Sequence, residues 1–73
     1  MNYREWFENS DTETLLRSLQ AIAGVLSEEE SEDSREKMNT IIELLREKQI
    51  KFPQHRNLID REISQEQVKT SQS

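Results

Sequence analysis

The stretches LLRSLQAIAGVL (residues 15–26) and MNTIIELL (residues 38–45) decide the fold of this chain. Apolar residues recur in both at intervals of three and four, and they are Leu15, Leu19, Ile22, Leu26, Met38, Ile41, Ile42 and Leu45. This period places one apolar stripe along each of two α-helices. Because a short polar connection separates the two stretches, we expect an antiparallel helical hairpin in which the stripes face each other.

The start of each helix carries a capping signal. Ser10 followed by Glu13 matches a capping box, which predicts a first helix over residues 12–26. The acidic run SEEESED is the connection to a second helix, expected over residues 33–50, and its carboxylates stabilise that helix by facing the positive end of its dipole. Three residues of this run are alternative caps for the second helix: Ser27, Ser31 and Asp33.

A third segment follows the second helix. Pro53 ends the second helix, because proline donates no N–H and disfavours α conformation in the residue before it, and it suits the first position of a new helix. Residues 54–65 are too short and polar to be helical unless they dock, and their apolar side carries Leu58, Ile59 and Ile63. Residues 66–73 contain only Val68 as an apolar residue, which predicts a disordered tail.

Large aromatic rings are concentrated at the N-terminus. Tyr3, Trp6 and Phe7 fall at i, i+3 and i+4, on one side of a short helix expected over residues 3–8. Two interpretations remain open. The rings cover the end of the hairpin, or they form an exposed anchor for another protein, a role in which Trp and Tyr are common. The scarcity of exposed apolar patches on soluble proteins favours the first interpretation.

These segments define an all-α fold, a small helical hairpin or bundle with a short aromatic N-terminal helix and a docked C-terminal helical segment. Seventy-three residues suffice for one small core, so we expect residues 1–65 to form a single domain. Hydrophobic residues make up only 32% of the chain, and a domain of this size gains stability by association. Cysteine is absent and no apolar run is long enough to span a bilayer, so we expect a cytoplasmic protein without membrane contact.

Charge is divided unevenly along the chain. The formal net charge is −5; residues 1–36 contain three Lys/Arg and ten Asp/Glu, whereas residues 37–73 contain seven and five. The acidic half argues against nucleic-acid binding, because phosphate contacts need Lys and Arg. The basic residues of the second half are interleaved with acidic ones. A weak DNA binder or an acidic DNA mimic is therefore a minor alternative.

Residue types that perform catalysis or bind metals are scarce. His55 is the only histidine, cysteine is absent, and one glycine is too few for a phosphate-binding loop. The numerous carboxylates lie in polar runs, where nothing desolvates them and raises the pKa toward a catalytic value. We expect no enzymatic activity, no metal site and no cofactor.

Two apolar residues, Leu44 and Ile50, lie off the stripe of the second helix, which indicates a second contact surface. The candidate interaction surface consists of these two and the N-terminal rings: Tyr3, Trp6, Phe7, Leu44 and Ile50. We expect a small acidic regulator, inhibitor or adaptor that binds another protein through a helical surface. The alternative is a self-associating structural module, a homodimer in which two hairpins form a four-helix bundle.

Overall fold

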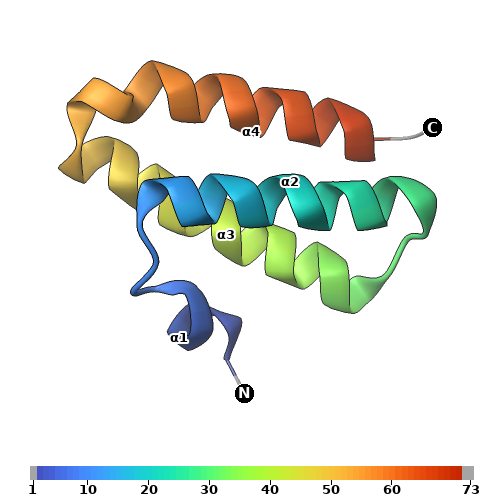
Figure 1. Cartoon of the computed structure of the whole chain (residues 1–73). Coiled ribbons are helices and arrows are strands. Elements are labelled where there is room, and N and C mark those ends of the chain that lie inside the picture. The colour runs from blue at the N-terminus through green and yellow to red at the C-terminus, as the bar shows by residue number, and fades with distance from the viewer. Residues whose placement is uncertain (1, 72–73) are drawn as a thin grey trace.

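Helices account for almost all of the chain that this computed structural model describes, residues 2–71 (Figure 1). In chain order they are α1 (Tyr3–Phe7), α2 (Thr12–Glu28), α3 (Glu32–Lys51), the short 3₁₀ helix η1 (Pro53–His55) and α4 (Arg56–Thr70). No strand occurs within residues 2–71. The prediction of an all-α fold is confirmed.

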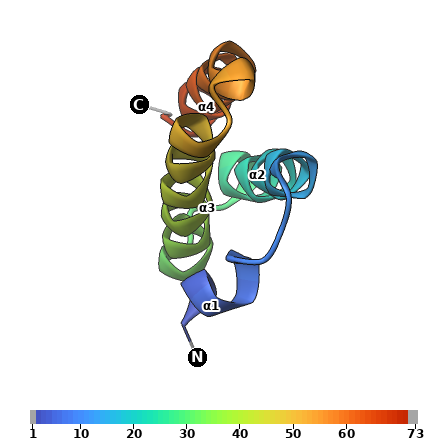
Figure 2. The same cartoon turned by 90° about the vertical axis from the view of Figure 1, so that its left-hand side faces the viewer.

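The helices are arranged around the α2–α3 hairpin. The two members of the hairpin run in opposite directions, and after η1 the chain returns along them as α4 (Figure 1). Helix α1 packs against α3 on the other side of the hairpin, so that α1 and α4 lie on opposite sides of it (Figure 2). The predicted hairpin, aromatic N-terminal helix and docked C-terminal segment are all present.

Local side-chain contacts set where the two long helices begin. Asp11 caps α2, and its carboxylate accepts the backbone N–H of Thr14 at 2.8 Å. The predicted cap, Ser10, lies one residue too early; a carboxylate at position 11 is also a stronger acceptor for a helix N-terminus than a hydroxyl. Ser31 caps α3 by accepting the N–H of Ser34, which selects one of the three alternatives.

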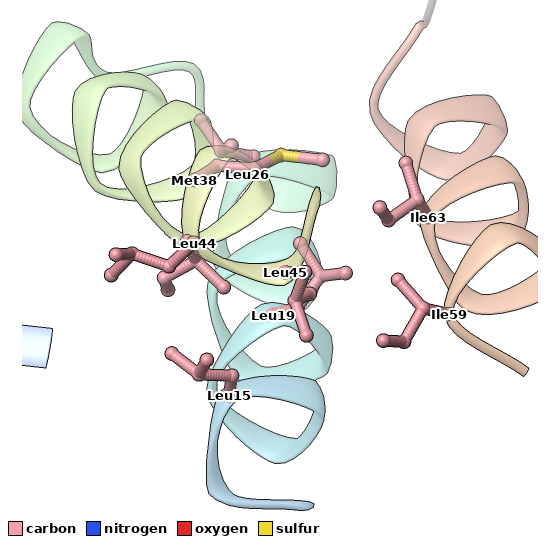
Figure 3. Close-up of a cluster of buried hydrophobic side chains, with 9 residues drawn as sticks. Leu15, Leu19, Leu26, Met38, Leu44, Leu45, Ile59 and Ile63 are labelled. Carbon is pink, nitrogen blue, oxygen red and sulfur yellow. The ribbon is translucent and has the colours of Figure 1, made fainter. Parts of the chain in front are cut away.

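Residues from three helices form the core (Figure 3). The buried cluster consists of Leu15, Leu19, Leu26, Met38, Ile41, Leu44, Leu45, Ile59 and Ile63. Ile59 and Ile63 point from α4 toward Leu19 and Leu45, so the third segment completes the core of the hairpin (Figure 3). Ile22 and Ile42, members of the predicted stripes, are only partly buried at the edge of this cluster.

Leu44 belongs to the core and not to an accessible surface. Its side chain is only 4% exposed, so the expectation that it contributes to an interaction surface is wrong. The reason is the position of α1. Lys37 and Glu47, which lie seven residues before and three residues after Leu44, both contact α1, so Leu44 lies on the side of α3 that α1 covers.

The C-terminal helix is longer than the sequence indicated. Helix α4 continues to Thr70, and both Glu66 and Thr70 are buried, so the predicted disordered tail is wrong for residues 66–70. These two residues extend the face that begins with Ile59 and Ile63 at spacings of three and four. The Arg35 guanidinium also donates to Thr70, at 3.4 Å to Oγ1 and 3.3 Å to the carbonyl oxygen. Ser71 is the C-cap of α4, and residues 72–73 of the predicted tail lie outside the described residues.

A matched pair of substitutions on α3 tests the assignment of Leu44. Leu44→Gln removes a buried side chain and places an amide in the core, which we expect to lower the free energy of unfolding by at least about 2 kcal/mol. Ile50→Gln makes the same change at a side chain that is 83% exposed, and should alter stability by less than about 0.5 kcal/mol. Thermal melting followed by circular dichroism measures both, and equal effects would contradict the assignment.

Truncation tests the docking of the last helical turn. We expect a chain that ends after Gln65 to melt roughly 5–10 °C lower, because it loses two buried side chains and the hydrogen bonds from Arg35, together worth about 1–2 kcal/mol. The control is Val68→Ala in the full chain, since Val68 lies in the same turn but is 74% exposed. An unchanged melting temperature in the truncated chain would show that the turn contributes nothing to the fold.

Candidate protein-binding site

Polar contacts hold α1 in a fixed position on α3. The Asn2 side chain caps α1 by accepting the N–H of Arg4 at 2.9 Å. The Arg4 guanidinium pairs with Glu47 at 2.5 Å, and the Tyr3 hydroxyl donates to the Asp33 carboxylate. A helix of five residues is not stable alone, so these contacts and ring packing keep it formed.

A hollow of about 140 Å³ lies where α1, α2 and α3 meet. Its lining residues are Tyr3, Trp6, Phe7, Ile22 and Lys37. The Trp6 side chain is 64% exposed beside this hollow, whereas Phe7 is half-buried and packs against the core. The two rings stack with their centroids 6.3 Å apart. Phe7 therefore covers the hairpin, as one interpretation of the sequence required, and Trp6 is left accessible.

The ionic groups at the edge of the hollow neutralise each other. The Lys37 ammonium lies 3.3 Å from an Asp33 carboxylate oxygen and 5.3 Å from the centre of the Tyr3 ring. The hydrogen bond to Asp33 raises the pKa of the Tyr3 hydroxyl, with smaller contributions from burial and from the negative charges of Asp33 and Glu36. The hydrogen bonds from Tyr3 and then Lys37 lower the pKa of Asp33. These groups fix α1 in place.

The structure brings together only three of the five residues proposed for the interaction surface. Tyr3, Trp6 and Phe7 share the hollow, while Leu44 is in the core. Ile50 lies in a separate, more open depression of about 490 Å³, together with Arg46, Gln49, Pro53 and Arg56. This depression and the hollow beside Trp6 share no lining residue.

Sequence reasoning missed the contributions of α2 and α3 to this site. Ile22 was assigned to the hidden stripe, yet it is only partly buried and lines the hollow. Val25, one turn further along α2, is 51% exposed, and its place at the margin of the apolar stripe was the only signal for it. Nothing in the sequence marked Lys37, because its role follows from where α1 docks.

The remaining features to consider are His55, the metal-ligating side chains and the helix lengths. His55 is half-buried and contacts the Phe52 ring, with centroids 5.7 Å apart. Within residues 2–71, no three His, Cys, Asp or Glu side chains come close enough to form a metal site. None of the helices over these residues is both long and apolar enough to cross a membrane. Comparisons with protein-family models, curated proteins and solved structures found no match to this chain.

The depressed pKa of Asp33 predicts how the site responds to acid. A carboxylate whose pKa is lower in the folded state stabilises the fold above its unfolded pKa, about 4, and that contribution is lost as the pH falls through the folded pKa. We therefore expect α1 to loosen below about pH 4, which a change in the fluorescence of the single tryptophan, Trp6, reports. Asp33→Asn should reduce this acid-induced change.

The control for this measurement is Asp60→Asn. Asp60 also has a lowered pKa, caused by hydrogen bonds from Gln49 and Arg46, but it joins α3 to α4 and is remote from Trp6. Asp60→Asn should keep the acid-induced change in Trp6 fluorescence. If both variants behave like the wild type, Asp33 does not hold α1 in place.

Proposed function

We propose that this protein is a small acidic regulator, inhibitor or adaptor that has no enzymatic activity and binds another protein through the surface around Trp6. The observation that carries the proposal is a large ring, 64% exposed, beside a hollow lined by residues of three helices. Tryptophan is among the side chains most enriched at energetically dominant positions of protein interfaces. Tryptophan is highly buried on average, so a ring this exposed beside an apolar hollow supports a binding surface.

The way α1 is attached favours binding. Arg4 and Tyr3 tie it to Glu47 and Asp33, and Phe7 packs into the core, so the surface is formed before any partner arrives. Association then loses little conformational entropy on this side of the interface. The hollow is about the size of one apolar side chain, and Val25, three residues after the lining residue Ile22 on α2, is a further exposed apolar side chain. We place this activity in the cytoplasm, in keeping with a chain that lacks cysteine.

A second candidate function is self-association, supported by Ile50. This side chain is 83% exposed and shares its depression with two arginines, Arg46 and Arg56. Arg46 is paired with Asp60, so Arg56 is the basic residue beside the exposed isoleucine that suits an acidic apolar surface, which the first half of the same chain provides. In this candidate the partner is a second copy, and the protein is a structural module.

Removal of the Trp6 ring tests the first candidate. We expect immobilised wild-type protein to retain a partner from lysate of its source cells, and Trp6→Ala to weaken that binding by at least about 30-fold, which corresponds to about 2 kcal/mol. The fold should survive, because the ring is mostly exposed. Ile50→Gln serves as the matched control and should bind normally.

The opposite pattern supports the second candidate. If sedimentation shows that the wild type dimerises and that Ile50→Gln abolishes the dimer while Trp6→Ala has no effect, self-association replaces partner binding. Retention of the same lysate protein by Trp6→Ala and the wild type would overturn the first candidate.

A further inference from the structure

The surface around Trp6 carries unbalanced negative charge. Among the described residues, two cations of this region are already paired, Arg4 with Glu47 and Lys37 with Asp33. In contrast, three exposed carboxylates form no ion pair within residues 2–71. They are Glu5 in α1, Glu8 at the C-terminal end of α1, and Glu36 in α3. A partner therefore meets free negative charge here and no free positive charge from these two residues.

Two of these carboxylates lie next to residues that line the hollow. Glu5 directly precedes Trp6 in α1. Glu36 lies one residue from Lys37, which lines the hollow, and its charge contributes to the raised pKa of Tyr3, another lining residue. The hollow itself presents the apolar side chains of Phe7 and Ile22 beside the Trp6 ring. The apolar hollow and exposed carboxylates therefore occur in the same region of α1 and α3.

We propose that the occupant of this site is a basic segment of a partner protein, an inference that rests on the proposed function. An aliphatic or aromatic side chain of that segment fills the hollow beside Trp6. Lysine or arginine residues flanking it pair with Glu5 and Glu36, and a guanidinium or ammonium group stacks on the exposed Trp6 face. The apolar anchor supplies affinity, and the flanking charges supply specificity and a faster encounter.

The same charges disfavour other occupants. An acidic segment would bring its carboxylates toward Glu5 and Glu36, while Lys37 and Arg4 are already neutralised by their own partners. Phosphate groups of a nucleic acid meet the same repulsion. A second copy that inserts Ile50 with the neighbouring Arg56 also has an apolar residue beside a basic one, and the experiment below distinguishes it.

Selection from a display library of random peptides on immobilised wild-type protein tests the proposal. The peptides of interest are those that bind the wild type and fail to bind Trp6→Ala. We expect them to be rich in Lys and Arg and to share an aliphatic or aromatic residue. One selected peptide, made synthetically with a fluorescent label, then serves as the probe for anisotropy measurements of affinity.

Matched double substitutions isolate the role of charge. Glu5→Gln combined with Glu36→Gln should lower the affinity for the probe peptide by about two- to fivefold per removed charge, which is the range measured for exposed ion pairs. Glu13→Gln with Glu62→Gln removes the same net charge from α2 and α4, on the α4 side of the molecule, and should leave the affinity unchanged. Higher salt should weaken the wild-type complex, because the screening length falls from about 30 Å at 0.01 M to about 10 Å at 0.1 M.

Three outcomes overturn the proposal, and they differ in what they say about the proposed function. Trp6-dependent peptides that are neutral or acidic would refute the basic occupant and leave a protein-binding Trp6 surface standing. An absence of Trp6-dependent peptides refutes the basic occupant, and the lysate experiment decides the function separately. Wild-type self-association that both Trp6→Ala and Ile50→Gln abolish would identify the occupant as a second copy.

Discussion

Helix α3 is the element against which the rest of the chain packs: α2, α4 and α1 each contact it, from different sides. Its buried residues Met38, Ile41, Leu44 and Leu45 cover about a third of the helix circumference at about 3.6 residues per turn, which is wider than a narrow stripe. Helix α1 has only five residues and α4 is polar, so both depend on packing, α1 against α3 and α4 against α2 and α3. The burial of α3 is thus the condition for every other feature, including the position of Trp6.

Polar contacts at the margins of α3 determine where each neighbour lies along it. Asp33, Lys37 and Glu47 hold α1. Arg46 and Gln49 both donate to Asp60 near the start of α4, at 2.6 and 2.9 Å, and Arg35 reaches Thr70 at its end. Exposed ion pairs contribute at most about 1 kcal/mol each, so their main effect is to select one register among apolar packings of similar energy.

The small size of this core also limits the kind of binding site that the protein can form. In this chain of 73 residues most of the large apolar side chains pack between α2, α3 and α4. The hollow near α1 has room for about one further side chain. Such a surface is suited to recognition of another chain through an anchor residue. The proposed function and its basic occupant both follow from one asymmetry: Phe7 faces the core, while Trp6 and the carboxylates around it face solvent.

Much of the architecture was predictable from sequence, because helix period and helix breakers are local properties. The stripes of the two long helices, the break at Pro53 and the short aromatic helix were all visible. So was the grouping of Tyr3, Trp6 and Phe7, which share the hollow.

The tertiary structure alone decided which faces are covered. Periodicity identifies the main apolar side of a helix but not the number of neighbours around it. Leu44 therefore looked like a surface residue until α1 covered that side of α3. Glu66 and Thr70 looked like a disordered tail because their types are polar, although their positions continue the face of Ile59 and Ile63. The order of the rings was likewise undetermined: Trp6 is exposed and Phe7 is not because α1 is anchored through Tyr3 and Arg4 to α3, a contact between residues 30 and 43 positions apart that no local pattern encodes.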